Sequence, residues 1–238
     1  MKVIPYPNEW LVYKPIDEMK GKRLGVFAHC FVKDGEQDAI KQAYKKIVDV
    51  AIEEETCLVL SASQSLVLPN HNLLYEEWAD YDEFFEVQVN RTYRNTFYKW
   101  LDPIRSDSIY AEFTNIFCSA GKHPVNIAPQ NAYVLVQSLQ IEPGNCEKAR
   151  LHLAEHVNEI SHDKKNLFAN AHQSINDPNH FLLYEIWQDF SDLINTQWHR
   201  SSREALLQQI YDNQNDAQSK SRLEVFQIYY DPEKYQPQ

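Results

Sequence analysis

The sequence contains an internal repeat with a spacing of 109 residues. Shifted by that distance, Leu73–Asp80 (LLYEEWAD) falls on Leu182–Asp189 (LLYEIWQD) without a gap. When positions 34–94 are compared with 143–203, 18 of the 61 pairs are identical, which is far more than chance gives. Self-similarity of this length is typical of a duplicated folding unit. The fold must therefore be built from two similar halves.

Each half predicts the same order of elements: a β-prone run, an amphipathic helix, two strands, a second helix and a last strand. In the first half these are Leu24–Val32, Glu36–Ile52, Leu58–Leu66, a strand from Leu73 to Trp78, a helix after Asp80, and Ile109–Phe117. In the second half they are Tyr133–Ile141, Cys146–Ile160, Leu167–Ile175, a strand from Leu182 to Trp187, a helix after Asp189, and Leu223–Tyr230. This β-α-β-β-α-β order is that of a ferredoxin-like unit.

The predicted fold is therefore α+β, with tandem ferredoxin-like repeats. Four strands with helices on one face leave the other face of each sheet bare, and two copies in one chain can cover these faces against each other. We therefore expect an intramolecular α+β barrel. The predicted boundaries are an N-terminal arm at 1–23, repeats at 24–117 and 133–230, a linker at 118–132 and a tail at 231–238.

Charge and composition narrow the class of partner. The formal net charge is −11, which disfavours binding to nucleic acids and anionic membranes. No apolar run is long enough for a signal peptide or a membrane span. The four cysteines show no C-x-x-C spacing, so we expect a cytoplasmic protein. Five glycines leave little room for a dinucleotide fingerprint.

Two segments carry a family resemblance. Asn70–Asp80 and Asp177–Trp187 resemble the hairpin turn and Tyr-Glu-x-Trp strand of the antibiotic biosynthesis monooxygenase (ABM) family, in the dimeric α+β barrel superfamily. The resemblance implies the barrel fold. It leaves the function open, because the family includes cofactor-free quinone-forming oxygenases, haem-degrading enzymes, small-metabolite enzymes and members without known activity.

The chain departs from the family pattern at two places. Quinone-forming and haem-degrading members often have an Asn on a pocket-facing strand, but Leu73–Trp78 and Leu182–Trp187 contain none. Members frequently have a His in the second helix. His199 is the candidate in repeat 2, and Asn90 stands there in repeat 1. Haem chemistry is therefore an alternative for repeat 2 only.

The third strands offer a pair of candidate residues in each repeat. Because side chains alternate along a strand, Glu76 shares a face with Trp78, and Glu185 shares one with Trp187. The indole provides a flat wall for an aromatic ring, and the carboxylate can accept a phenolic proton. In the alternative interpretation these are a core Trp and a Glu that binds backbone or a helix end. Tyr75 and Tyr184 point to the opposite face.

The second strands carry a polar face in both repeats. Its residues are Ser61, Ser63 and Ser65 in repeat 1, and Asn170, His172 and Ser174 in repeat 2. This face either meets solvent or lines a pocket. His29, on the first strand, is the corresponding candidate base of repeat 1, because histidine titrates near neutral pH.

Two further patterns involve charged side chains. Arg91/Arg94 and Arg200/Arg203 recur at i, i+3 spacing, and they bind either a substrate carboxylate or acidic residues that tie repeat to repeat. His152–His156 matches the inverted zinc motif H-x-x-E-H. Its helix is expected to bury Ala149, Leu153, Val157 and Ile160, with His152 and Glu155 toward solvent, so we predict no zinc enzyme.

Together these observations favour a cofactor-independent ABM-type monooxygenase, an oxidoreductase that acts on O₂ and a small aromatic, phenolic or quinol-like molecule. Haem binding through His199 and non-catalytic ligand binding or scaffolding remain alternatives. We expect no metal, and a monomeric pseudo-dimer or a homodimer of it. The expected bases are His172 or Glu185 in repeat 2, which is predicted to be the working copy, and His29 or Glu76 in repeat 1. The remaining site candidates are Trp78, Trp187, Asn170, Arg200, Tyr75 and Tyr184.

Overall fold

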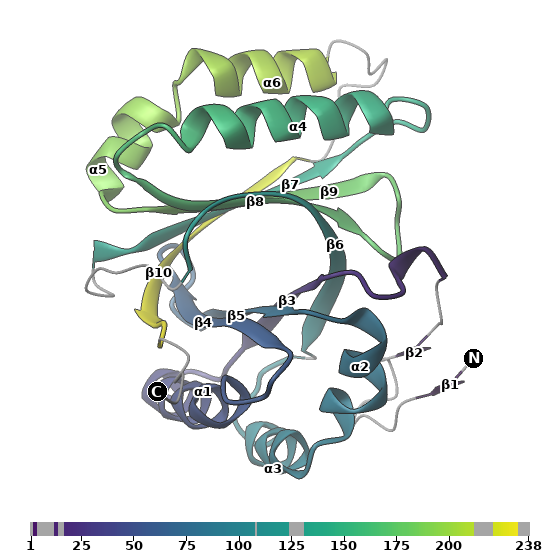
Figure 1. Ribbon diagram of the computed structural model, residues 1–238. Helices are drawn as coiled ribbons and strands as arrows, with labels where there is room; N and C mark the ends of the chain where they lie inside the picture. Colours follow the sequence, from purple (N-terminus) through teal and green to yellow (C-terminus); the bar gives the residue numbers. More distant parts are fainter. Residues whose placement is uncertain are drawn as a thin grey trace, which may run out of the picture. The chain divides into compact units, whose positions relative to one another are not determined.

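The computed structural model describes residues 2–3, 12–13, 17–107, 109–123, 131–211 and 221–232. The chain divides into two compact units (Figure 1). The first comprises Met1–Phe113 with Tyr229–Gln238, and the second comprises Thr114–Ile228. In each unit, helices pack on one face of an antiparallel sheet. No helix within the described ranges combines the length and apolarity needed to cross a membrane.

The first unit contains repeat 1. Its elements are β3 (Leu24–Phe31), α1 (Gln37–Ala51), β4 (Cys57–Ser65), β5 (His71–Trp78), α2 (Tyr81–Glu86), the 3₁₀ helix η2 (Gln88–Asn90), α3 (Thr92–Leu101) and the start of β6 (Tyr110–Gly121). Strand β5 lies between β3 and β4 and is antiparallel to both. Before the repeat, the short strands β1 (Lys2–Val3) and β2 (Val12–Tyr13) pair with each other, and η1 (Asp17–Met19) follows.

The second unit contains repeat 2. Its elements are β7 (Tyr133–Gln140), α4 (Cys146–Ile160), β8 (Asn166–Ser174), β9 (His180–Trp187), α5 (Phe190–Asp192), the π-helix η4 (Leu193–Gln197), α6 (Ser201–Tyr211) and β10 (Arg222–Tyr230). Strand β9 pairs with β7 and β8, and β10 pairs with the other edge of β7. Helices α4 and α6 lie side by side on one face of this sheet (Figure 1).

The predicted α+β class and the tandem ferredoxin-like repeats are confirmed. The predicted helix starts after Asp80 and Asp189 are also found. The Asp80 carboxylate accepts a hydrogen bond from the backbone N–H of Glu83, and Asp189 accepts one from that of Asp192. Such caps satisfy N–H groups that have no partner within the helix.

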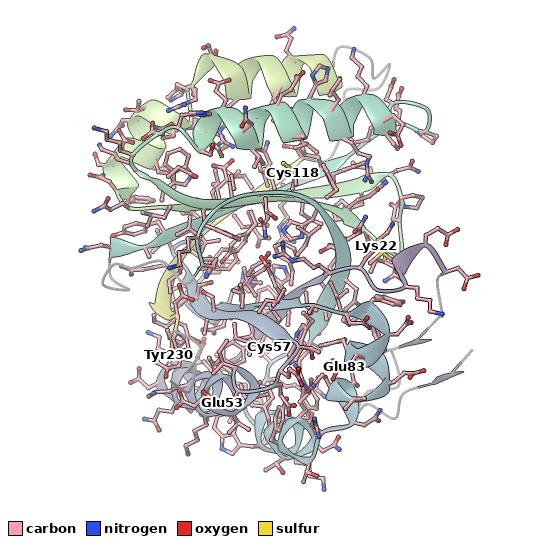
Figure 2. The ribbon with its side chains drawn as sticks, viewed as in Figure 1. Lys22, Glu53, Cys57, Glu83, Cys118 and Tyr230 are labelled. Atoms are coloured by element: carbon pink, nitrogen blue, oxygen red, sulfur yellow. The ribbon has the colours of Figure 1, made fainter. Side chains whose placement is uncertain are left out.

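The fourth strand of each repeat is divided between the two units. Strand β6 continues to Gly121, past its predicted end at Phe117, and its residues from Thr114 onward pair with β8. The end of β10 reaches α1, where Lys45 Nζ donates a 2.8 Å hydrogen bond to the hydroxyl of Tyr230 (Figure 2). Residues 124–130 and 233–238 of the predicted linker and tail lie outside the described residues.

The helix-facing side of each sheet is the apolar core. In the second unit, residues of β7, β8 and β9 pack against α4, with Leu135, Leu153, Val157 and Trp187 fully buried. Burying each such side chain contributes about 1.5–3 kcal/mol. All four cysteines are free; Cys57 and Cys118 are labelled in Figure 2.

Candidate functional site

A buried cluster of Glu, Trp and Arg lies between sheet and helices in the first unit. Trp78 Nε1 donates to Glu76 Oε2 at 2.8 Å, and Arg94 Nη2 donates to the same oxygen at 2.7 Å. The guanidinium carbon of Arg94 is 5.2 Å from the centroid of the Trp78 ring, within cation–π range. Arg94 is 3% exposed. The cluster joins β5 to α3.

The second unit repeats the cluster and extends it. Trp187 Nε1 donates to Glu185 at 2.7 Å, and Arg203 Nη2 donates to both Glu185 oxygens at 2.8 and 2.6 Å. His156 Nε2 lies 3.3 Å from Glu185 Oε1, and Arg203 Nη1 donates to Gln137 Oε1 at 3.2 Å. The carboxylate is therefore surrounded by donors.

The donors around Glu185 determine its protonation. Burial raises the pKa of this carboxyl, but the charge of Arg203 and the hydrogen bond and charge of His156 outweigh it and lower the pKa to about 2. In Arg94, burial acts to lower the pKa, but the charge of Glu76 outweighs it and raises the pKa well above its usual value. Glu185 is thus a poor base, and Arg94 is a permanent cation.

A small cavity of about 30 Å³ lies beside the Glu76–Arg94 pair. Its lining residues come from β3, β5, the α2–α3 region and β6: Val26, Ala28, Glu76, Phe84, Val89, Arg94, Tyr98, Ile109, Ala111 and Phe113. Ala28 occupies the position of Gln137 in repeat 2, so no amide side chain reaches the arginine there. Within the described residues, Arg94 Nε has no hydrogen-bond partner. Repeat 1 therefore has an open position next to its buried cation.

Strand β5 also carries an asparagine on this face. The third strands begin at His71 and His180, two residues earlier than predicted, so Asn72 shares the face of Glu76 and Trp78. The predicted range Leu73–Trp78 contains no Asn, but the longer strand of the structure does. Asn72 is 0% exposed, and neither amide atom has a hydrogen-bond partner among the described residues. Phe181 takes the equivalent position in repeat 2.

The opposite face of each sheet holds the predicted histidines. His29 Nδ1 lies 2.9 Å from His71 Nε2, and the ring of Phe31 stacks on His71. His172 Nδ1 lies 2.9 Å from Thr114 Oγ1, and Asn170 is buried. The polar face of the second strands is therefore buried in both units, which rules out the solvent-facing interpretation.

The other predicted site residues do not join the clusters. Tyr75 and Tyr184 are buried on the histidine side, where Tyr75 donates to Glu77 at 2.7 Å. His199 is exposed, in the turn between η4 and α6. Arg200 forms an ion pair with Asp163. The structure thus brings together Glu76 with Trp78 and Glu185 with Trp187, and separates these pairs from the remaining candidates.

The expected tie between repeats through the arginines is wrong. Arg91 pairs with Glu54 at 2.7 Å, and Arg94, Arg200 and Arg203 also find their acids within their own repeat. Arg91 and Arg200 precede α3 and α6, whereas Arg94 and Arg203 lie within these helices, so each pair has one outer and one buried arginine.

The sequence patterns singled out Arg94 and Arg203 without assigning them to the Glu–Trp clusters, and they did not predict His156, Gln137 or Asn72 as site residues. Signals for three of these residues were present. The arginines recur in both repeats, and His156 lies three and four residues from the buried Leu153 and Ile160, which places it on the buried face of α4. The zinc motif drew attention to His156 for a different chemistry.

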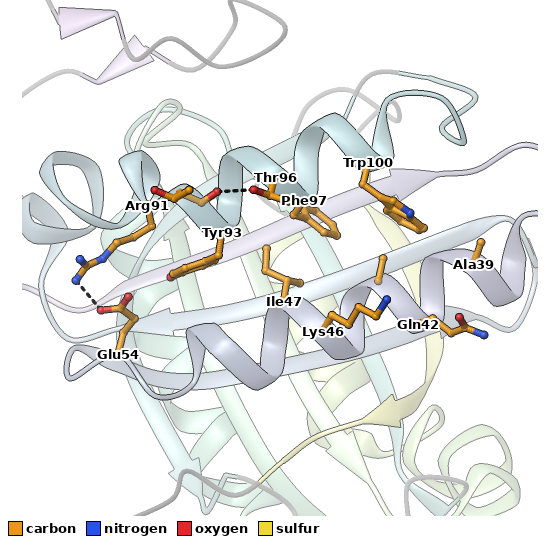
Figure 3. A pocket seen from close by; sticks show the side chains of 12 residues that line it. Ala39, Gln42, Lys46, Ile47, Glu54, Arg91, Tyr93, Thr96, Phe97 and Trp100 are labelled. Carbon is orange, nitrogen blue, oxygen red and sulfur yellow. Dashed lines mark hydrogen bonds and ion pairs between the residues drawn. The ribbon is translucent and has the colours of Figure 1, made fainter.

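A larger groove lies between α1 and α3 in the first unit (Figure 3). Its volume is about 870 Å³. The side chains of Tyr93, Phe97 and Trp100 point from α3 toward α1. The remaining lining residues come from α1, its end and the start of α3: Ala39, Gln42, Ala43, Lys46, Ile47, Glu54, Arg91, Thr92 and Thr96.

Residues 132–206, which cover most of repeat 2, match the model of the antibiotic biosynthesis monooxygenase family. The predicted resemblance to this family is thus confirmed for repeat 2. Repeat 1 carries the same buried Glu–Trp–Arg cluster as repeat 2.

Three solved structures share the fold over most of the chain. A "putative monooxygenase" from Fusobacterium nucleatum has a TM-score of 0.76 at 13% identity, covering 92% of this chain and 99% of its own. A protein of the same description from Lactobacillus acidophilus has a TM-score of 0.69 at 8% identity, and the match covers 87% of this chain and 94% of that protein. An "anthrone oxidase-like protein" has a TM-score of 0.66 at 12% identity, and the match covers 88% of this chain and 92% of that protein. A search of curated proteins gives no match.

Proposed function

We propose that this protein is a cofactor-independent ABM-type monooxygenase that oxidises a small phenolic or quinol-like aromatic molecule with O₂, and that the reaction takes place beside Arg94 in repeat 1. The observation that carries the proposal is the buried guanidinium whose Nε has no partner within the described residues and which borders a cavity. The family of repeat 2 and the fold shared with an anthrone oxidase-like protein support it.

Arg94 is suited to stabilise negative charge. A phenolate and the superoxide that O₂ becomes on accepting its electron are both anions, and a fixed cation in a buried site lowers their energy more than water does. Glu76 holds the guanidinium in place, and the Trp78 ring lies beneath it. A cavity of about 30 Å³ admits O₂ or the hydroxyl edge of a phenol, but not a whole ring.

The proposed chemistry converts a CH₂ group activated by a phenol into a ketone. The phenol loses its proton to water, and the anion transfers one electron to O₂, which gives an organic radical and superoxide. These combine into a peroxide at the carbon. Loss of water then leaves C=O, so that R₂CH₂ and O₂ become R₂C=O and H₂O. No further reductant is required.

The structure favours repeat 1 over repeat 2 as the working copy, contrary to the expectation from the sequence. In repeat 2, Gln137 and His156 occupy the space and the hydrogen bonds around the cluster, and Glu185 has a pKa of about 2. His29 and His172 lie on the other sheet face. We therefore propose Arg94 as the catalytic residue and Glu76 as its positioning residue.

An oxygen electrode tests the proposal. Purified protein, without added flavin or metal, is screened against phenols, quinols and anthrone. We expect O₂ uptake with at least one of them and a fall of about 100-fold in Arg94→Gln, which corresponds to about 2.7 kcal/mol of lost anion stabilisation. Arg200→Gln, at the outer arginine of repeat 2, is the matched control and should keep the activity.

Two results would overturn the assignment. Unchanged uptake in Arg94→Gln would remove the arginine from the reaction. No uptake with any compound, combined with saturable binding of the same compounds, would favour the non-catalytic ligand-binding alternative. Haem titration tests the haem alternative separately. A Soret band that is lost in His199→Ala would support haem binding instead.

A further inference from the structure

The groove between α1 and α3 has the dimensions of a ligand site. Its volume of about 870 Å³ lies within the range of about 300–1,000 Å³ that is usual for small-molecule pockets. One wall is aliphatic, from Ala39, Ala43 and Ile47, and the other is aromatic. Trp100 is 41% exposed, so its ring is accessible to a ligand.

The aromatic wall belongs to one repeat only. Tyr93, Phe97 and Trp100 have Ser202, Leu206 and Gln209 as their equivalents at the 109-residue spacing. Repeat 2 forms the same helix pair without these rings. The fold therefore does not require them, and a bound ligand gives them a role.

The polar groups of the groove favour an anion. Lys46 extends between the two helices (Figure 3), and none of the described residues forms an ion pair with it. Arg91 is at one end, already paired with Glu54. In a chain of net charge −11, an unpaired cation on an apolar surface is a selective anchor for a carboxylate. The equivalent of Lys46 in repeat 2 is Glu155, which would repel one.

Tyr93 connects the groove with the buried cluster. Its ring lines the groove, and its hydroxyl lies 3.3 Å from Gln88 Oε1. Burial raises the pKa of Tyr93 to about 12, while the charge of Arg94 acts in the opposite direction. The groove therefore reaches the residue next to Arg94, whereas Arg94 itself lines only the small cavity.

We propose that the groove between α1 and α3 binds a planar aromatic acid, with its ring against Tyr93, Phe97 and Trp100 and its carboxylate on Lys46. The ring would then lie against Tyr93, the residue before Arg94. That this acid is the compound oxidised rests on the proposed function, whereas its binding does not.

Calorimetric titration of the full chain with naphthalene-2-carboxylate tests the binding. Removing one ring or one charge at a partly exposed site costs about 1 kcal/mol, so we expect Trp100→Ala and Lys46→Gln each to weaken binding about five- to tenfold. Two variants are the controls. Lys99→Gln lies next to Trp100 but outside the groove lining, and Leu151→Ala lies on α4, the helix of repeat 2 that corresponds to α1. Both should keep the affinity for naphthalene-2-carboxylate within twofold of the wild type. Thermal unfolding of every variant shows that it is folded.

Two further probes separate ring from charge. Decanoate has the charge without the ring, and 2-naphthalenemethanol has the ring without the charge; each should bind at least about fivefold more weakly than the naphthoate. Equal binding of either probe, unchanged binding in Trp100→Ala and Lys46→Gln, or no binding at all would overturn the proposal.

The binding result is independent of catalysis. If naphthalene-2-carboxylate binds as expected but no compound supports O₂ uptake, the groove proposal stands and the oxygenase proposal fails. If O₂ uptake depends on Arg94 but Trp100→Ala and Lys46→Gln leave naphthoate affinity unchanged, the oxygenase stands and the groove proposal fails.

Discussion

The two repeats use the same buried cluster in different surroundings. Both keep Trp, Glu and Arg at equivalent positions. In repeat 2 the arginine also binds Gln137 and the glutamate binds His156, whereas repeat 1 has Ala28 and Ile47 there. The shared residues are those that tie the third strand to the second helical segment. The divergent residues decide whether protein side chains use the hydrogen-bond donors of the arginine or leave one of them for a ligand.

Removal of the arginines is expected to have the largest effect. Arg203→Met leaves Glu185 buried without its cation, which costs about 3–5 kcal/mol of folding free energy. Arg94→Met should cost less folding free energy. In repeat 2 the loss of Arg203 also removes the donor of Gln137, whereas repeat 1 has Ala28 at that position. Urea unfolding of both variants measures the difference. The double variant Glu185→Gln/Arg203→Met should recover part of the loss, and equal losses in the two single variants would contradict the difference between the repeats.

Acid should destabilise repeat 2 through Glu185. Its folded-state pKa of about 2 lies below the usual 4.5, so the stabilisation is present above pH 4.5 and is lost as the pH falls through 2. We expect the stability gap between the wild type and Glu185→Gln in urea to be widest above pH 4.5 and to narrow toward pH 2. A gap that stays constant would show that the carboxylate is not held ionised.

Exchanging the residues that distinguish the clusters tests which copy is active. Ala28→Gln places an amide at the cavity beside Arg94, as Gln137 does beside Arg203, and should lower O₂ uptake about tenfold, or about 1.4 kcal/mol. Gln137→Ala is the reciprocal change and should leave uptake within twofold. If only Gln137→Ala lowers the rate, the working copy is repeat 2.

The helix caps should show the smallest effects and no difference between repeats. Asp80→Ala and Asp189→Ala each remove one N-cap acceptor and should cost about 1 kcal/mol in urea unfolding. Asp80→Asn and Asp189→Asn keep an acceptor and should cost little. A loss at one cap only would show that the two helices differ in their contribution to stability.

The sequence predicted the sheets better than the site. Strand alternation fixes the face of a side chain without further information, so the pairing of Glu76 with Trp78 followed directly. The start of the third strand was missed because His71 and Asn72 follow Pro69 and Asn70, and such residues are typical of turns. These two residues belong to the strand because they pair with β3, and local propensity gives no information about that pairing.

The partners of the arginines depend on a break in the helix. One continuous helix was expected after Asp80, but α2 is followed by the 3₁₀ turn η2, and Arg91 has extended backbone before α3 begins. In repeat 2 a π-helix occupies this region. Each irregularity changes the angular position of later residues, so a 3.6-residue period cannot say which side chain meets Glu76 or Glu185.

The passage of β6 from one unit to the other limits how this chain can be dissected. By sequence, Thr114–Phe117 belong to repeat 1 and Cys118–Gly121 to the predicted linker, yet this segment supplies the edge partner of β8. Gly121 approaches the carbonyl of Leu167 so closely that a methyl group there would lie 2.4 Å from its oxygen. A fragment that starts at the second repeat would expose the whole backbone edge of β8, which invites aggregation. The gene's duplication boundary is therefore a poor place to cut the protein.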